Sequence, residues 1–280
     1  MGEDAGVRAH DTFRIEPEAG LSRIGLGEMW AYRDLLFFLT WRDILIRYKQ
    51  AVLGVAWAVV QPLLTMIVFT VVFGGVLHVN TGSIPYPVFC FAGLLPWQLF
   101  AGALQRSGQS LVGNANLLTK VYFPRLVIPI SAVIAGLVDF AIGLLVLFGL
   151  MAYYHVAPTW SAVLLPLFVL FALLAALGVS LWLSALNVLY RDVQYVIPFL
   201  VQLWMFVSPV MYPITPHSTV TKIVVGLNPM TGVIDGFRWA LAGGEPPTGF
   251  IWASVIVVVL LLVTGLYYFK YMERVFADVV

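Results

Sequence analysis

Charged residues are scarce in this chain, and their scarcity excludes a water-soluble globular domain. Asp, Glu, Lys and Arg make up 10% of the 280 residues, whereas an average soluble domain carries about 25%. No charged residue lies between Gln50 and Gln105, and Asp139 is the only one between Leu126 and Tyr190. Because 61% of the residues are hydrophobic and the mean hydropathy is +0.95, the sequence predicts an all-α protein with several membrane spans.

Other absences narrow the chemistry. The single cysteine, Cys90, has no partner for an intrachain disulfide, and we expect it to be a packing residue. The motif G-x-x-x-x-G-K-[ST] is missing, which excludes ATP hydrolysis through a P-loop in this chain. The four histidines are scattered over tail and loop positions, so no metal cluster is predicted. We therefore expect no catalytic residue and no cofactor bound by this chain.

Long apolar runs predict six transmembrane helices, because about 20 apolar residues cross a bilayer. The expected spans are residues 52–77, 86–104, 126–154, 160–186, 196–212 and 250–269, within a permease domain of residues 51–270. All Lys and Arg residues except Lys222 and Arg238 fall on one side of this arrangement, which predicts that both termini are cytoplasmic. Residues 1–28 have no compact apolar core, so we expect a flexible cytoplasmic tail rather than a signal peptide. Residues 271–280 form a second tail.

Residues 29–50 mix aromatic rings with charges. At helical spacing, Phe37, Trp41 and Tyr48 share one side, which is typical of a helix lying in the membrane interface. A soluble amphipathic helix docked on a partner is the alternative. The basic residues of this segment are candidates to hold a lipid-linked diphosphate by charge-assisted hydrogen bonds, or to bind ordinary anionic lipids; they are Arg33, Arg42, Arg47 and Lys49.

Two loops and one acid carry further signals. In the internal loop 106–124, "NANLLTKVYF" predicts about two helical turns stopped by Pro124. This loop either only sets the membrane topology or is a docking site for a cytoplasmic motor protein. In the outer segment 213–249, "STVTKIVVGL" and "LNPMTGVIDGFRWALAGG" predict two short re-entrant helices. The second has Asn228 as N-cap, Pro229 at its first position, an Asp235–Arg238 pair, and Phe237 on its apolar face.

Asp139 is either a functional intramembrane acid or a structural one that hydrogen-bonds a Trp, Ser or Asn or pairs with a loop cation.

Four motifs carry a resemblance to a known family. They are "IRYKQAVLGVAWAVVQPLLTMIVFTVVFG" (residues 46–74), "NLLTKVYFPRLVIP" (116–129), "NVLYRDV" (187–193) and "SPVMYP" (208–213). In this order they resemble the type-two ABC export permeases, above all the polysaccharide-export branch that moves O-antigen and capsule (the Wzm type), with teichoic-acid exporters as near relatives. The resemblance covers nearly the whole chain apart from the tails.

The resemblance implies a six-helix permease of the bacterial inner membrane that works as a homodimer with two copies of a separate ATPase, which binds ATP and Mg. It implies a gate helix at 29–50, outer gate helices within 213–249, and a polysaccharide substrate carried on a polyprenyl diphosphate lipid. It also implies a coupling helix at about 114–123 that contacts the ATPase. The candidate contact residues are Asn116, Leu117, Leu118, Lys120, Tyr122 and Phe123.

Aromatic side chains are candidates to line the channel between two such bundles, because sugar rings stack on aromatic planes. The candidates are Trp57, Phe69, Trp97, Phe100, Trp204, Phe206 and Tyr212. The alternative for each is helix packing or a place in the interfacial aromatic belt. Two other functions stay open at this point: a type-two permease for small amphiphiles, drugs or teichoic acid, and an ion-coupled carrier that uses Asp139. The second is not favoured, because no other acid or histidine lies in an expected span.

Overall fold

The chain is a bundle of helices. The computed structural model describes residues 30–49, 54–213, 219–243, 246 and 251–279, and these residues form helices and short connections with no strand among them. A backbone in a bilayer has no water to hydrogen-bond, so helices that satisfy their own amides are the expected solution for this sequence. The predicted all-α class is confirmed.

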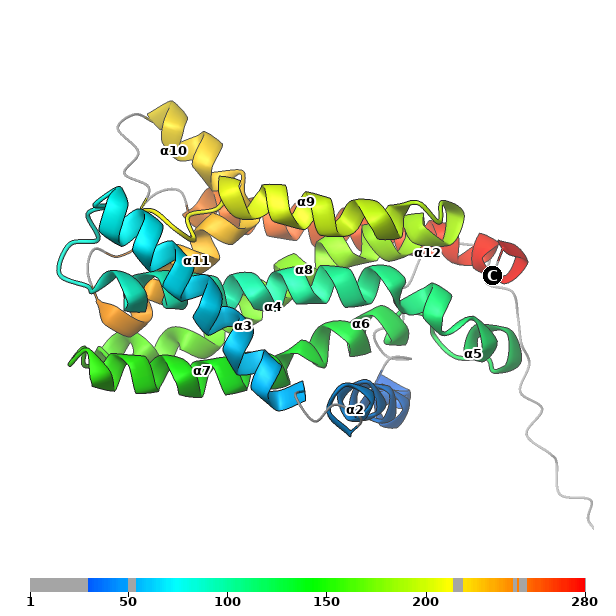
Figure 1. Ribbon diagram of the computed structural model, residues 1–280. Coiled ribbons are helices and arrows are strands. Elements are labelled where there is room, and N and C mark those ends of the chain that lie inside the picture. Colours follow the sequence, from blue (N-terminus) through cyan, green and yellow to red (C-terminus); the bar gives the residue numbers. More distant parts are fainter. Residues whose placement is uncertain (1–29, 50–53, 214–218, 244–245, 247–250, 280) are drawn as a thin grey trace, which may run out of the picture.

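Most of the long helices run side by side along one axis, and α3 (Gly54–Phe69) slants across them (Figure 1). The long helices are α3 with its π-helical continuation η1 (Thr70–Val76), α4 (Tyr86–Gly113), α6 (Val127–Ile134) followed by α7 (Gly136–Tyr153), η2 (Trp160–Leu164) followed by α8 (Leu165–Leu189), α9 (Val193–Val207) and α12 (Ile251–Val279). At one end, α2 (Arg33–Lys49) crosses the bundle and packs against α6, and α5 (Ala115–Lys120) follows α4. At the other end lie α10 (Thr219–Gly226) and α11 (Pro229–Ala242).

Five helices in the described part of the chain are long and apolar enough to cross a membrane: Ala56–Val76, Tyr86–Gly113, Val127–Tyr153, Trp160–Leu189 and Ile251–Arg274. The sixth predicted span corresponds to α9, an apolar helix of 15 residues. At about 1.5 Å per residue it measures about 22 Å, less than the hydrocarbon core of about 30 Å. The chain is thus a multi-pass membrane protein, and a sixth span through α9 stays a prediction.

Helix α4 is the centre of the bundle, and most of its side chains are buried. It packs against α8, α6, α7, α11, α9 and α3. Helices α8 and α12 cross with their backbones close together, since a Cβ on Gly178 would lie 2.9 Å from the backbone nitrogen of Leu262. A Cβ on Gly265 would lie 2.6 Å from the carbonyl oxygen of Gly178. Small residues that let two backbones touch are a common basis of helix association in membranes.

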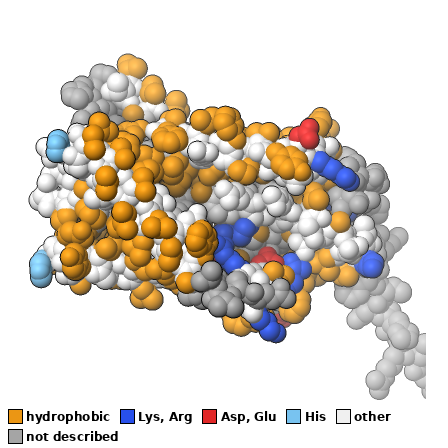
Figure 2. All heavy atoms as spheres, viewed as in Figure 1, with side chains coloured by type: hydrophobic (Ala, Val, Ile, Leu, Met, Phe, Trp, Pro, Cys, Tyr) orange, Lys and Arg blue, Asp and Glu red, His pale blue; other side chains and the backbone are white. Residues whose placement is uncertain are grey.

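A second core lies at the end of the bundle that carries α2 and α5. Leu39, Leu111, Phe123 and Phe269 are buried there, each from a different segment. Figure 2 shows that Lys and Arg side chains gather toward this end, whereas hydrophobic side chains cover the rest of the visible face. A charged end beside an apolar belt is what a bilayer-embedded bundle requires.

Candidate functional site

Asp139 does not face lipid. Its carboxylate lies in the first turn of α7, where Oδ2 is 2.6 Å from Nη1 of Arg47 and 3.6 Å from Nη1 of Arg106, and Oδ1 accepts a hydrogen bond from the Tyr48 hydroxyl. Burial, with the hydrogen bond to Asp139, raises the pKa of Tyr48 to about 12, so this phenol stays protonated as a donor. We call these four residues the Asp139 cluster. It joins α2, α4 and α7 at one point.

The cluster changes the interpretation of the basic residues in α2. Of the two alternatives for Asp139, the pairing of its carboxylate is observed, with a tyrosine instead of a Trp, Ser or Asn. Arg47 pairs with Asp139, Arg42 with Asp43 at 2.8 Å, and Arg33 lies 3.9 Å from Asp34. Lys49 is exposed. The four cations therefore do not converge on one diphosphate site, because three of them lie beside carboxylates of this chain.

A polar cavity of about 270 Å³ adjoins the Asp139 cluster. Arg47, Arg106 and Asp139 line it together with residues of α3 and α4, among them Gln61, Gln98 and Gln105. Arg106 also donates from Nε to the carbonyl of Ala132 at 3.2 Å. No glutamine was singled out from the sequence, although Gln98 and Gln105, which are seven residues apart in an apolar helix, are a visible signal.

The predicted coupling residues separate into exposed and buried ones. Helix α5 is six residues long and ends at Lys120, with Val121 extended; the predicted helix end at Phe123, just before Pro124, is three residues too late. The first part of loop 106–124 is also not a loop, because α4 continues to Gly113. Tyr122 is 89% exposed, and Asn116 and Lys120 are exposed. Leu117 and Leu118 are partly buried against the second core, and Phe123 is only 5% exposed within it.

This distribution corrects the prediction for Phe123. A side chain at 5% exposure anchors the loop to α4, α6 and α12 and offers no surface to a partner. Tyr122, Lys120 and Asn116 are the exposed residues of the predicted set and are free to contact a partner.

The predicted features of α11 are confirmed. Asn228 is its N-cap and accepts a hydrogen bond from the Met230 amide at 3.0 Å, Pro229 opens the helix, and Gly243 ends it with φ +76°. Asp235 and Arg238 lie 3.6 Å apart. Phe237 is fully buried and meets Phe140 of α7 edge-on, with ring centroids 5.9 Å apart. The membrane-dipping arrangement of α10 and α11 stays a proposal.

Arg238 has a larger role than the predicted ion pair. Its side chain is buried, its guanidinium lies 3.6 Å from the ring centroid of Phe89, and it donates to three carbonyl oxygens. The distances are 3.0 Å to Phe89 of α4, 2.5 Å to Pro209 and 2.6 Å to Val210. The last two belong to the "SPVMYP" motif, which is not helical here. Arg238 therefore ties α11 to α4 and to the segment after α9.

The predicted channel aromatics also divide. Trp97 and Phe100 are 2% and 0% exposed and pack in the main core, which corrects the prediction for these two: buried inside one protomer, they present no surface to a substrate. Trp57 and Phe206 are exposed at 57% and 51%, and Phe69 is partly buried. Trp204 donates to Asn228 Oδ1 at 3.0 Å, and the Tyr212 hydroxyl donates to the Phe206 carbonyl at 2.7 Å.

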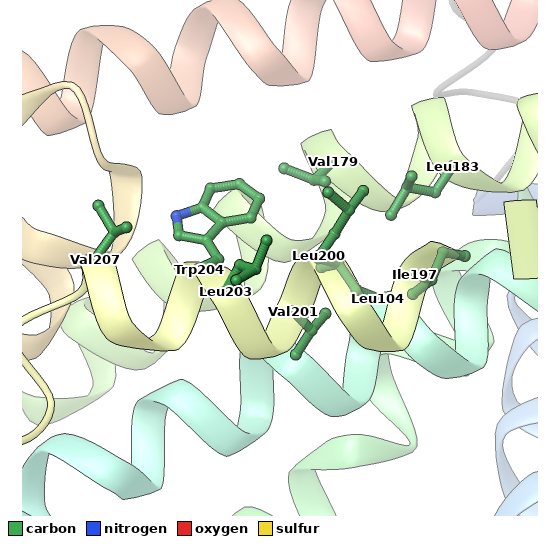
Figure 3. A pocket seen from close by; sticks show the side chains of 9 residues that line it. All are labelled: Leu104, Val179, Leu183, Ile197, Leu200, Val201, Leu203, Trp204 and Val207. Atoms are coloured by element: carbon green, nitrogen blue, oxygen red, sulfur yellow. The ribbon is translucent and has the colours of Figure 1, made fainter. Parts of the chain in front are cut away.

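An apolar groove of about 370 Å³ runs beside α9 (Figure 3). Figure 3 shows Leu200 and Trp204 of α9 near Val179 and Leu183 of α8, with Leu104 of α4 behind. Every residue that lines the groove is apolar. The sequence did not single it out, since an apolar residue in an apolar span carries no sign of the face it occupies.

Comparison with known proteins places the chain in a family. Residues 34–242 match the model of the ABC-2 type transporter family. Because the match covers most of the chain, the protein belongs to the ABC-2 type transporter family and is a membrane transport protein.

Individual relatives are consistent with this family. The chain is 33% identical over 238 residues to the O-antigen export system permease protein RfbA of Myxococcus xanthus, covering 82% of this chain and 91% of that protein. It is 30% identical over 247 residues to an O-antigen export system permease protein RfbA of Klebsiella pneumoniae, covering 88% and 95%. It is 29% identical over 210 residues to the polysialic acid transport protein KpsM of Escherichia coli, covering 72% and 79%.

Proposed function

We propose that this chain is the membrane-spanning permease subunit of an ATP-driven exporter that moves a lipid-linked polysaccharide out of the cytoplasm. The similarity to two O-antigen export permeases along nearly the whole chain carries this proposal. The relative named for polysialic acid transport supports a polysaccharide as the substrate class. A polyprenyl diphosphate carrier is the part of the proposal that rests on the family resemblance.

The energy source lies in a separate subunit. The chain has no P-loop, so ATP and Mg bind a cytoplasmic ABC ATPase, present in two copies. Helix α5 and the exposed Tyr122 and Lys120 are the proposed contact with that ATPase. They lie at the same end of the bundle as α2 and the carboxyl end of α12.

Two copies of the chain face each other in this proposal, because the core of one bundle is filled by its own side chains. The membrane is the bacterial inner membrane, and both termini are cytoplasmic, since Lys and Arg concentrate on that side. Helix α2 lies in the inner interface: Phe37 and Trp41 are 71% and 51% exposed and stack on each other with ring centroids 6.5 Å apart. Exposed rings of this kind suit the boundary between headgroups and acyl chains.

The contacts in the Asp139 cluster speak against the alternative of an ion-coupled carrier. The carboxylate of Asp139 is engaged in ion pairs with Arg47 at 2.6 Å and Arg106 at 3.6 Å, which links three helices of the same chain and gives this acid a structural role. The amphiphile alternative predicts that surface polysaccharide is unaffected by loss of this chain.

Deletion of the gene followed by complementation tests the function. In a strain that makes a surface polysaccharide, deletion should remove the long-chain polysaccharide from the surface and leave it inside the cell. The full-length chain should restore it, and co-purification should recover an ATPase subunit. Wild-type surface polysaccharide after deletion would contradict the proposal, as would export that needs no ATPase.

A further inference from the structure

Helix α4 is buried along its length except for one narrow face. Between Val88 and Leu111, every residue is buried except Gln98, Ala101, Gly102, Gln105, Arg106 and Gln109. The glutamines, with Gly102 between them, follow an i, i+4, i+7, i+11 spacing, which places them on one side of a helix. At 1.5 Å per residue this side extends over about 16 Å. Between Val88 and Leu111, the central helix of an apolar bundle thus exposes only amides, small residues and one arginine.

The amides on this face have no hydrogen-bond partner among the residues that the structure describes. The side chains of Gln98, Gln105 and Gln109 make no hydrogen bond to any described residue, and neither does Gln61, which faces the same cavity from α3. An unsatisfied amide in hydrocarbon costs several kcal/mol. Polar side chains in spans therefore face a protein interior or a water-filled space. Gln61, Gln98 and Gln105 line the polar cavity beside the Asp139 cluster, where water or a polar ligand can satisfy their amides, and Gln109 is exposed one turn further along α4.

The chemistry of this face matches sugar hydroxyls. A hydroxyl both donates and accepts, and a glutamine amide offers two donors and one acceptor. Between Gln98 and Gln105 the space beside Gly102 is filled by the guanidinium of Arg106, whose Nη1 lies 2.9 Å from where a Cβ of Gly102 would be, so its N–H donors lie on the same face as the amides. The adjoining cavity of about 270 Å³ is near the lower end of the range of small-molecule sites.

A diphosphate fits this place less well than a neutral sugar. The carboxylate of Asp139 lies in the same cavity and is already paired with Arg47 and Arg106. A phosphate would have to displace that carboxylate or accept repulsion from it. Hydroxyls can instead add to the free N–H groups and amides without breaking the pairs.

We propose that Gln61 of α3 and Gln98, Gln105 and Gln109 of α4, here called the glutamine track, bind the hydroxyl groups of the exported glycan in the inner half of the pathway. The inference rests on the proposed function and deepens it: amides hold the sugars of the moving chain by replaceable hydrogen bonds. Aromatic residues buried in the core, such as Trp97 and Phe100, act behind this surface as packing.

The test uses the full chain with its ATPase in a strain that makes a surface polysaccharide. Gln98→Leu with Gln105→Leu should lower the surface polysaccharide at least about tenfold, since two hydrogen bonds per sugar position are lost, while chain level and ATPase co-purification stay unchanged. Val259→Leu with Val263→Leu is the control, because both residues are exposed apolar positions of α12, and this variant should export normally. A photo-reactive benzophenone residue at position 105 should capture glycan, detected by a carbohydrate stain, and the same residue at position 145, on the exposed apolar face of α7, should not.

A second measurement tests directly whether water reaches this cavity. Cys90 is the only cysteine and is buried, so a Gln105→Cys chain should react with a water-soluble methanethiosulfonate reagent, whereas a Leu145→Cys chain on the exposed face of α7 should not. If deletion of the chain leaves export intact, the proposed function fails. If deletion abolishes export but the double leucine variant exports normally, or position 105 captures no glycan, the glutamine track is refuted and the proposed function stands.

Discussion

Replacing Arg238 by methionine should destabilise the end of the bundle that carries α10 and α11. Methionine fills most of the apolar volume of the arginine stem, so the substitution mainly removes the guanidinium. The carbonyls of Pro209 and Val210 then lose donors at 2.5 and 2.6 Å. Both lie in a non-helical segment, where no helical amide replaces the lost donor. Asp235 loses its only described ion-pair partner at 3.6 Å.

The size of the effect follows from these contacts. Each buried carbonyl left without a donor costs about 1–3 kcal/mol, and removal of one partner from a buried ion pair costs about 3–5 kcal/mol. These terms overlap, so we expect the free energy of unfolding to fall by roughly 3–5 kcal/mol. On the scale of about 2–4 °C per kcal/mol for a chain of this size, the smaller figure lowers the melting temperature by roughly 6–12 °C.

Thermal unfolding of the purified protein in detergent, followed by intrinsic tryptophan fluorescence, measures this shift. Arg191→Met is the matched control, because Arg191 is exposed, and it should melt within about 1 °C of the wild type. The melting temperature of Arg238→Lys should lie between those of Arg238→Met and Arg191→Met. A lysine ammonium keeps the charge, but it cannot donate to three separate carbonyl oxygens as the planar guanidinium does. If Arg238→Met melted like the Arg191→Met control, the guanidinium contacts would not stabilise the fold.

Three further substitutions test other parts of the structure. Tyr122→Ala should weaken co-purification of the ATPase without changing the melting temperature, because its side chain is 89% exposed. Gly178→Leu should separate α8 from α12 and lower the melting temperature by several degrees, because its Cβ would lie 2.9 Å from a backbone nitrogen. Asp139→Asn should lower stability by about 1–2 kcal/mol in thermal unfolding at low salt, because two arginines lose their shared carboxylate.

Each of these has a control in the same chain. Trp160→Ala removes an aromatic ring that is also 89% exposed, at the opposite end; equal loss of the ATPase in both would speak against a specific contact. A Cβ on Gly149 meets nothing within 4 Å, so Gly149→Leu should be tolerated, and equal damage would show that the helix crossing is not the cause. In the Asp139→Asn variant the positive charges of Arg47 and Arg106 lie close together without a carboxylate between them. Adding Arg47→Gln should therefore restore part of the stability; a further decrease would show that repulsion between these two arginines is not the cause.

The features of the fold that depend on local sequence were predictable. The cap and the end of α11 follow from Asn228, Pro229 and Gly243, whose backbone preferences act within a few residues. The all-α class follows from the bilayer alone. The helix ends were less accurate, because α4 continues to Gly113 on polar residues that hydropathy assigned to a loop.

Which face of a span is buried was not predictable, because an apolar residue does not reveal whether it faces protein or lipid. Phe100 and Phe206 look alike in sequence, yet one is fully buried and the other 51% exposed. The Asp139–Tyr48 contact joins residues 91 positions apart, and only the three-dimensional fold brings them together. The glutamines of α4 were the missed signal: polar side chains in a span do report a face.

The reach of Arg238 has a consequence for biosynthesis. The carbonyl of Phe89 receives its guanidinium donor from a residue 149 positions later in the chain. At about 5–20 residues per second, the ribosome needs roughly 7–30 s to make that stretch. Helix α4 is therefore synthesised well before Arg238, its hydrogen-bond partner in α11, and most of the later helices are made in between. The end of the bundle that carries α11 can form its final contacts only after α11 has been synthesised. A nascent chain halted before Arg238 should stay open there to proteases outside the membrane, as a stage of assembly that the finished protein no longer shows.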